Sequence, residues 1–202
     1  PDNAQYWVMV KDNNTGLIWE VKQTSNGSPD YNNPHDPDNI YTWYDSNPTT
    51  NGGDAGTSGV LTDTEDFIAA VNNNRLGGFT DWRMPTKEEL VTILKSDVPA
   101  PPTIDTTYFN NTIPGYYWTS TTFPNSTDSA FKVDFYSATE GYHAKSGQYH
   151  ARAVRSAGII MLPNSLMVYI YPQPAIDLGA LWRVDGGSWQ NSGATVSNLS
   201  NA

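Results

Sequence analysis

The side chains that could perform acid–base chemistry or hold a metal are three histidines and 21 acidic residues, with no cysteine. His35, His143 and His150 do not have the spacing that places two histidines on one helical turn, so they do not predict a zinc site. The lack of cysteine excludes disulfides, thiolate ligands and a cysteine nucleophile. No Gly-x-Ser-x-Gly elbow selects a serine for a catalytic triad. We therefore expect no catalytic residue, no metal and no cofactor.

The acidic residues leave two alternatives open. A glycan-processing enzyme would need two positioned carboxylates, and no pair is singled out by its context. Calcium prefers oxygen ligands, which the Asn- and Asp-rich segment 23–59 supplies, although without the spacing of an EF-hand loop. Asx-rich loops more often satisfy their own backbone groups. The oxygen ligands in question are Asp30, Asp36, Asp38, Asn39 and Asp45.

Aromatic and polar side chains between residues 116 and 150 are the candidate ligand contacts. Sugars stack on aromatic rings, and proteins dock on them equally well. Three tryptophans, Trp19, Trp82 and Trp118, lie in strand and helix-entry patterns and are expected in the core. The predicted ligand-binding residues are Tyr116, Tyr136, Tyr142, His143, Gln148, Tyr149 and His150. We expect this set to gather on one exposed surface.

The composition restricts the partners. Eleven basic and 21 acidic residues give a net charge of −10, which repels nucleic acid and anionic lipid. No apolar run is long enough to span a membrane, so no membrane insertion is expected. Asn, Ser, Thr, Asp and Gly supply most of the polarity, a mix typical of extracellular domains. An extracellular or cell-surface location is predicted.

Local patterns predict the elements that must position these residues. Segments 6–10 and 17–21 flank an Asn/Gly turn and predict a β-hairpin. Capping boxes at Thr62 with Glu65 and at Thr86 with Glu89 predict two helices, over residues 64–73 and 87–95. Strand patterns follow over residues 116–121, 131–136 and 149–155.

The tail carries a second group of strand patterns. Apolar and aromatic residues alternate over residues 166–171, and residues 180–199 hold a hairpin and one more short strand. A tail of this size rarely builds a sufficient core alone. We therefore expect Trp182, Trp189 and their neighbours to dock within the chain or against a second chain.

A set of motifs resembles one bacterial family. Residues 15–19 (TGLIW), 77–90 (GGFTDWRMPTKEEL), 117–121 (YWTST) and 152–155 (RAVR) match, in order, the family of the C-terminal domain of the Legionella collagen-like adhesin. The resemblance implies a C-type-lectin-like fold, related to formylglycine-generating enzymes, whose catalytic cysteines are lacking here. In the shared block, Asp81, Trp82, Arg83 and, near the end of the domain, Arg155 are interpreted as a buried ion pair and core aromatic, because buried charges need partners. These four are structural rather than catalytic.

Two further resemblances concern smaller segments. Residues 129–155 resemble the variable regions of lectin-fold proteins diversified by retroelements, with Asn-codon-accessible residues between fixed positions. The fixed positions would be Ala130, Phe131, Val133, Phe135, Lys145, Val154 and Arg155. A plain Tyr- and Ser-rich β-region is the alternative. Tyr, Ser, Asp, Gly and His also suit binding surfaces. The tail resembles β-sandwich repeats of bacterial surface proteins, cut before their last strands.

These observations combine into one prediction. The fold class is α+β: a C-type-lectin-like binding domain over residues 1–158, with two helices and a twisted antiparallel sheet, followed by an incomplete small β-sandwich-like module over 159–202. The function is extracellular ligand recognition, as an adhesin or receptor-like protein that binds a glycan or a cell-surface protein. A structural subunit of a surface appendage, forming a homo-oligomer or filament through the C-terminal module, is the alternative. The net charge of −10 disfavours sulfated polysaccharide as a ligand unless Lys132, Lys145 and Arg152 form a local basic patch.

Overall fold

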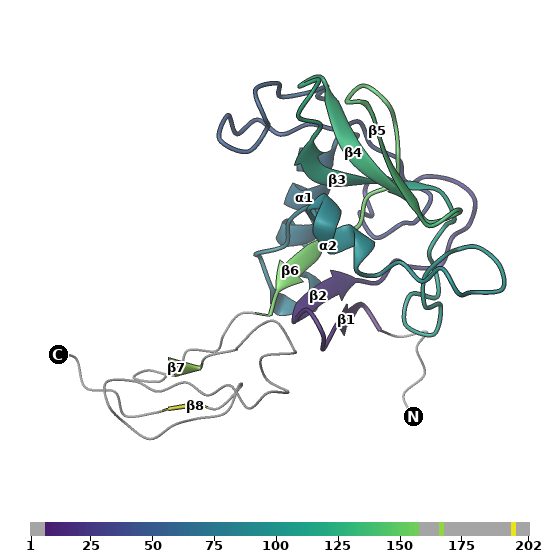
Figure 1. The fold of residues 1–202 in the computed structure, drawn as a ribbon. Helices are drawn as coiled ribbons and strands as arrows, with labels where there is room; N and C mark the ends of the chain where they lie inside the picture. Colours follow the sequence, from purple (N-terminus) through teal and green to yellow (C-terminus); the bar gives the residue numbers. More distant parts are fainter. Residues whose placement is uncertain (1–6, 158–165, 168–194, 197–202) are drawn as a thin grey trace. The chain divides into compact units, whose positions relative to one another are not determined.

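The computed structural model describes residues 7–157, 166–167 and 195–196 (Figure 1). The chain divides into two compact units, Pro1–Ala157 and Gly158–Ala202. In the second unit, β7 (Leu166–Met167) and β8 (Thr195–Val196) pair antiparallel. The other predictions for the tail, including the docking of Trp182 and Trp189, lie outside the described residues.

The first sheet joins the beginning and the end of the first unit. Its strand order is β1 (Met9–Lys11), β2 (Leu17–Glu20) and β6 (Val154–Ser156), and both pairings are antiparallel. The predicted hairpin is confirmed. The Asp12 carboxylate accepts hydrogen bonds from the Asn14 backbone and the Thr15 hydroxyl, and Gly16 takes the positive φ that ends the turn.

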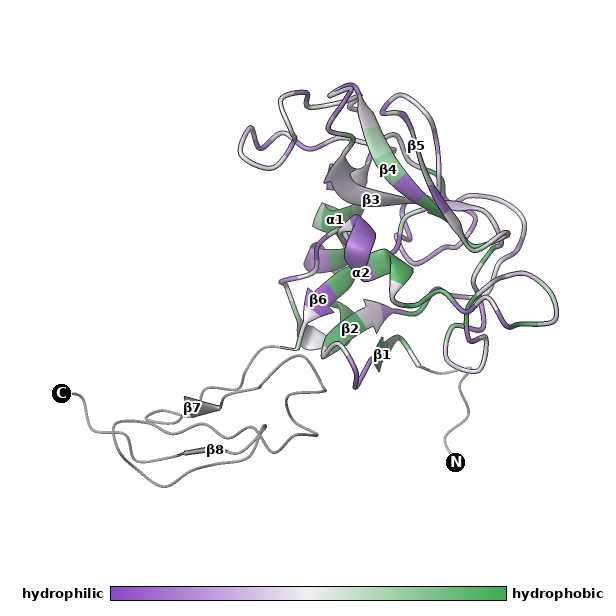
Figure 2. Ribbon diagram, in the orientation of Figure 1, coloured by the Kyte–Doolittle hydropathy of each residue, from purple (hydrophilic) through white to green (hydrophobic). Residues whose placement is uncertain are grey.

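The second sheet carries the strands that hold most of the candidate ligand contacts. Its order is β3 (Tyr116–Thr122), β4 (Ser129–Asp134) and β5 (Thr139–Ala144), again antiparallel. Figure 2 shows hydrophobic and hydrophilic residues alternating along β4. Alternate residues of a strand point to opposite faces, so this pattern gives the sheet two faces with different surroundings.

The two helices lie between the sheets in Figure 1 and differ in how well the sequence predicted them. Helix α2 (Lys87–Val91) begins with the expected capping box of Thr86 and Glu89, but ends at Val91 rather than Lys95. Helix α1 (Thr64–Asn73) has the predicted bounds, but its N-cap is Asp63, whose carboxylate accepts from the Asp66 backbone. The capping box expected from Thr62 is therefore wrong.

The Glu65 side chain, expected in that box, turns instead to the long loop and accepts two hydrogen bonds from Ser46. Asp63 follows Thr62 in the chain, and its carboxylate also reaches the backbone N–H groups of the first helical turn, so it takes the capping role in place of Thr62. A single 3-10 turn, Leu76–Gly78, follows α1.

The expected α+β class with a C-type-lectin-like fold is wrong, because the described structure is mostly β. Two three-stranded antiparallel sheets form its frame, and the α-helices contain only 10 and 5 residues. The second helix is short because the Thr92 hydroxyl donates to the Glu89 carbonyl and closes the helix after Val91. Turns and loops make up most of the remaining chain.

The middle of the long segment 23–59 enters the core, although both of its flanks are exposed. Within it, Tyr41 and Trp43 are 2% and 1% exposed. Tyr41 forms an antiparallel bridge with Tyr149, and the Trp43 backbone donates to the Lys145 carbonyl. Residues 41–44 therefore run as an irregular strand between the start of α1 and the chain that leads into β6.

Candidate ligand-binding face

One face of the second sheet gathers four of its side chains into a cluster. Tyr116 and Trp118 alternate along β3, Trp118 pairs with Lys132 of β4, and Ala130 of β4 pairs with His143 of β5. Residues that are opposite one another in an antiparallel pair share a face, and so do alternate residues of one strand. Tyr116, Trp118, Lys132 and His143 therefore point to the same side.

Tyr149 covers this face from the segment that follows β5. Its ring centroid lies 5.3 Å from that of Tyr116, 4.9 Å from that of Trp118 and 5.5 Å from that of His143, each in an edge-to-face arrangement. The Tyr149 backbone exchanges hydrogen bonds of 3.1 and 2.8 Å with Tyr41. We call Tyr116, Lys132, His143 and Tyr149 the tyrosine face.

Lys132 places a positive charge between the two tyrosine rings. Its Nζ atom lies 3.0 Å from the Tyr116 ring centroid and 5.1 Å from the Tyr149 ring centroid. In the described part of the chain the ammonium makes no ion pair or hydrogen bond, and its attraction to the rings is a cation–π interaction. Burial lowers the pKa of Lys132, and Asp134 offsets this only in part.

The rims of the tyrosine face are accessible. Tyr116 is 42% exposed, and His143 and Gln148 are exposed as well, whereas Tyr149 is half-buried. Burial raises the pKa of the Tyr149 hydroxyl, so this group stays protonated and can donate a hydrogen bond. The face thus offers aromatic surface and hydrogen-bond donors, while Lys132 itself is only 8% exposed.

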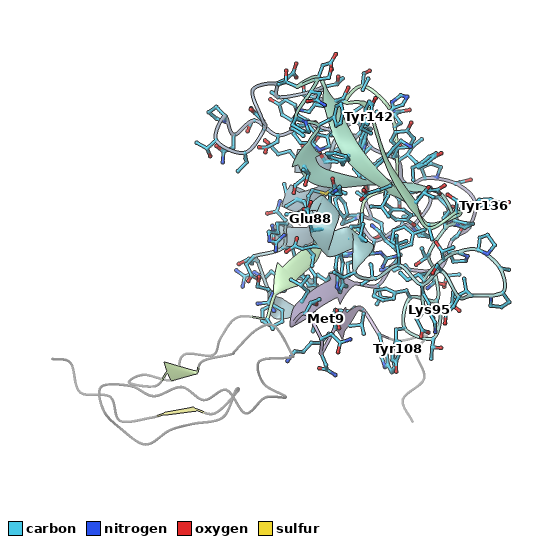
Figure 3. The ribbon with its side chains drawn as sticks, viewed as in Figure 1. Met9, Glu88, Lys95, Tyr108, Tyr136 and Tyr142 are labelled. Atoms are coloured by element: carbon cyan, nitrogen blue, oxygen red, sulfur yellow. The ribbon has the colours of Figure 1, made fainter. Side chains whose placement is uncertain are left out.

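The other predicted contacts do not join this face. Tyr142 lies opposite Phe131 and therefore on the other side of the sheet, where its ring stacks on Phe123 at 3.8 Å. Tyr136 lies in the turn between β4 and β5 and is 63% exposed. Figure 3 shows Tyr142 and Tyr136 at well-separated positions. The expected single surface of seven residues is therefore divided.

His150 is a packing residue rather than an exposed contact. Its ring packs against that of Tyr117 at 5.1 Å, and its Nδ1 atom lies 3.1 Å from the Asn39 carbonyl oxygen. Its backbone hydrogen bonds to β3 through Tyr116 and Trp118. Burial lowers the pKa of this imidazole, which favours the neutral form.

The residues expected to be structural make two ion pairs. Arg155, with a side chain only 6% exposed, binds Asp81 at 2.7 and 3.1 Å and stacks on Phe79, while the Asp81 side chain is 57% exposed. The hydrogen bond from Arg155 lowers the Asp81 pKa. Trp82 is 2% exposed, as a core aromatic should be.

Arg83 does not pair within the motif, because it reaches forward to α2. Its guanidinium donates to both carboxylate oxygens of Glu89 at 2.7 and 2.6 Å, and its side chain is 42% exposed. The expectation that Arg83 is largely buried is therefore wrong. Its role is to hold the start of α2, where Glu89 also accepts from the Thr86 backbone.

Sequence patterns did not indicate a buried charge cluster at the centre of the first unit. Glu20 is fully buried and contacts Lys22 at 3.1 Å and His35 at 2.8 Å. Burial by itself would raise the Glu20 pKa, but these two partners outweigh it and lower the pKa to about 2. Arg152, also fully buried, donates to the Glu20 carbonyl and to the Thr112 hydroxyl.

Lys132, Lys145 and Arg152 do not form the basic patch that sulfated polysaccharide would require. Lys145 is 2% exposed, and its ammonium donates to the carbonyl oxygens of Asn51 and Asp54. Arg152 is 0% exposed. Lys132 belongs to the tyrosine face but is itself only 8% exposed.

The acidic residues of the long loop hydrogen bond to nearby backbone and hydroxyl groups. Asp38 accepts from the backbones of Asn26 and Gly27 and from the Ser25 hydroxyl, which lowers its pKa against the opposing effect of burial. Asp36 accepts from the Asp38 backbone. In the described residues no group of three or more His, Asp or Glu side chains is placed to hold a metal. The calcium alternative stays a prediction.

The comparison with protein families places the chain. A model of the Lcl C-terminal domain matches residues 8–155, so the chain belongs to this family. Membership in this family indicates an adhesin-like bacterial surface protein. No curated protein and no solved structure matches the chain. None of the helices in the described ranges is both long enough and apolar enough to cross a membrane.

Proposed function

We propose that the domain is a non-catalytic extracellular recognition module that binds a cell-surface glycan through the tyrosine face. One observation carries the proposal: the rings of Tyr116 and Tyr149 flank an ammonium that has no carboxylate partner in the described residues. The rings supply surface for stacking against a sugar, and the Tyr149 hydroxyl supplies a donor for a ligand oxygen.

The rigidity of the face supports binding. Tyr149 is fixed through its backbone to Tyr41, and Tyr116 is fixed by the β3–β4 pairing. Side chains that are already ordered lose little conformational entropy when a ligand arrives. A tyrosine has only two side-chain torsions, which further lowers this cost.

The carboxylate nearest in sequence to the face favours recognition over hydrolysis. Asp134 is buried, and its two oxygens accept hydrogen bonds from the Tyr136 backbone and the Ser137 hydroxyl. A glycosidase needs two carboxylates aimed at one bond. Asp134 instead closes the turn between β4 and β5.

We propose further that residues 129–155 are a diversified region. Of the positions proposed as fixed, Ala130, Val133, Phe135 and Lys145 are at most 2% exposed. Most positions proposed as variable lie on exposed turns and on β5, including Tyr136, Ser137, Thr139, Tyr142 and His143. A near-copy of this coding stretch beside a reverse transcriptase gene would support the proposal, and a genome without one would contradict it.

An array of immobilised glycans and cell-surface proteins tests the binding function. The double variant Tyr116→Ala/His143→Ala should weaken binding of the best array ligand about tenfold or more, with an unchanged melting temperature. The matched control is Tyr136→Ala/Tyr142→Ala, which removes two exposed aromatic residues outside the tyrosine face and should retain affinity. Equal losses in both variants would contradict the assignment of the face, and binding to proteins alone would replace the glycan as ligand.

A further inference from the structure

A pocket of about 580 Å³ is lined by none of the seven predicted ligand contacts. The long loop, the first turns of α1 and the segment from Arg83 to Thr86 form its walls, and the end of β3 closes it. Its volume is within the range of pockets that bind small molecules or single anchoring side chains.

The interior of the pocket is apolar. Trp43, Tyr44, Ile68 and Met84 line it, and the last three remain partly exposed although each is flanked by core residues. The Trp43 indole is fixed from behind, because its Nε1 donates to the Thr119 carbonyl and the Lys145 ammonium lies 3.9 Å from its ring centroid. Apolar surface of this kind gains free energy when a hydrophobic group covers it.

The charged residues that line the pocket differ in whether they are ion-paired. Arg83 is neutralised by its two hydrogen bonds to Glu89. Asp45 and Glu65 accept hydrogen bonds from neutral groups, and neither makes an ion pair among the described residues. Lys145, whose ammonium lies 3.9 Å from the Trp43 ring centroid, attracts Asp45 and offsets part of its charge, so the pocket combines an apolar interior with a modest excess of negative charge.

A second aromatic surface is linked to the pocket through Lys87. Thr86 and Thr121 line the pocket, the Lys87 backbone donates to the Thr121 hydroxyl, and the Lys87 ammonium lies 4.9 Å from the Phe131 ring centroid. Phe131 in turn packs against Phe123, on which Tyr142 stacks. A partner seated in the pocket would thus find further aromatic contact area nearby.

We propose that this pocket binds one apolar side chain of a protein partner in which that side chain is flanked by lysine or arginine. The apolar group fills the space over Ile68 and Met84, and the flanking cation meets Asp45 and Glu65. A buried anchor with complementary charge at its rim is the usual composition of a protein–protein contact centre. The proposal does not depend on the tyrosine face.

The same observations disfavour other occupants. A sugar ring, which carries hydroxyl groups, would cover the apolar surface of Trp43, Ile68 and Met84 less well than an apolar side chain would. An anionic lipid would be repelled by Asp45 and Glu65.

Methionine methyl NMR of the full chain tests the proposal. The chain has four methionines; Met84 lies in the pocket, and Met9 lies on β1 as an internal control. The probes are three peptides, acetyl-Lys-Phe-Lys-amide, acetyl-Glu-Phe-Glu-amide and acetyl-Lys-Gly-Lys-amide. The first should shift the Met84 methyl signal and leave Met9 in place, with a dissociation constant roughly three- to tenfold lower than that of the second. The third should produce no shift.

Variants and salt then separate the two parts of the recognition. Asp45→Asn/Glu65→Gln keeps the hydrogen-bond acceptors and should remove the preference for the lysine peptide. Salt at about 1 M should have the same effect, because the Debye screening length is then only about 3 Å. Ile68→Gln should weaken both phenylalanine peptides, while the matched Val91→Gln on α2 should not. Equal affinity for the lysine and glutamate peptides, absence of any Met84 shift, or a Met84 shift with phosphatidylglycerol vesicles but not with peptide would each overturn the proposal.

Discussion

Tyr41 and Tyr149 exchange two backbone hydrogen bonds, of 2.8 and 3.1 Å, across the interior of the first unit. Tyr41 belongs to the long Asn- and Asp-rich segment, and Tyr149 belongs to the tyrosine face. Residue 41 is also in the core, where its ring contacts Phe67 of α1. The long segment therefore sets the position of a candidate ligand contact, although it holds none of the predicted ligand contacts itself.

Gly56 tests how firmly the long segment is held. Gly56 has a φ of +84°, and a Cβ added there would collide with the Trp43 carbonyl oxygen, so Gly56→Ala should cost about 2 kcal/mol or more of unfolding free energy. Gly78 has a similar φ of +87° with no atom within 4 Å of an added Cβ. Gly78→Ala therefore controls for backbone strain alone and should cost less. If urea unfolding gives equal losses of unfolding free energy for the two variants, the Trp43 carbonyl moves aside at no cost in stability.

Trp82 is expected to be the most stability-critical residue of the DWR motif. It is 2% exposed, and its Nε1 donates to the Leu76 carbonyl, so Trp82→Ala should lower the free energy of unfolding by about 3–5 kcal/mol. The control Tyr136→Ala removes a side chain that is 63% exposed and should change it by about 0.5 kcal/mol or less. A thermal melt that hardly moves while binding disappears would assign Trp82 to the ligand site.

The Asp81–Arg155 pair should respond asymmetrically to mutation. Asp81→Ala removes a mostly exposed carboxylate and should cost about 1 kcal/mol at most. Arg155→Ala also removes the guanidinium that packs on Phe79 and should cost about 2 kcal/mol. Chemical unfolding of both single variants and of the double variant measures the coupling. If Asp81→Ala proves the more costly, the pair is held by the carboxylate rather than by packing.

Glu20 should make the stability depend on pH in the acid range. Its pKa is lowered from 4.5 to about 2, so the folded state binds fewer protons than the unfolded chain between these values. The stabilisation is complete above about pH 5 and is lost as the pH falls toward 2, with a contribution on the order of 3 kcal/mol. The loss of stability caused by Glu20→Gln should therefore shrink as the pH falls.

Urea unfolding of the native chain and of Glu20→Gln between about pH 6 and pH 3 measures this difference. Glu88→Gln is the control, since the Glu88 side chain is 71% exposed, and it should change stability by about 0.5 kcal/mol or less throughout. A difference for Glu20→Gln that stays constant over the whole pH range would refute the assignment.

Local elements of the fold were predictable because their causes lie within a few residues. The turn at Asp12 and Gly16 and the capping box at Thr86 and Glu89 are completed by neighbours in sequence. The α1 cap was displaced by one residue because Asp63 competes with Thr62 for the same role. The class was wrong because sheet content depends on pairings between distant segments, such as β2 with β6, that local patterns do not contain.

The candidate site was only partly predictable for the same reason. Composition drew attention to tyrosines and histidines near the end of the domain, but the faces on which they lie depend on strand register. Tyr142 and His143 are adjacent in sequence and therefore lie on opposite faces of β5. The His150 ring is partly buried, and its Nδ1 atom contacts the Asn39 carbonyl oxygen. This contact joins distant segments, and no local pattern encodes it.

The order of the first sheet has a mechanical consequence. β2 pairs with β1 on one side and β6 on the other, with Met9 opposite Glu20 and Ser156 opposite Leu17. The chain therefore enters β1 beside one end of β2 and leaves β6 beside the other end. A force that pulls residues 9 and 156 apart acts along the strands, while the hydrogen bonds between them run perpendicular to the strands. The bonds are then sheared together instead of opening one at a time, the loading geometry in which a short sheet resists extension best.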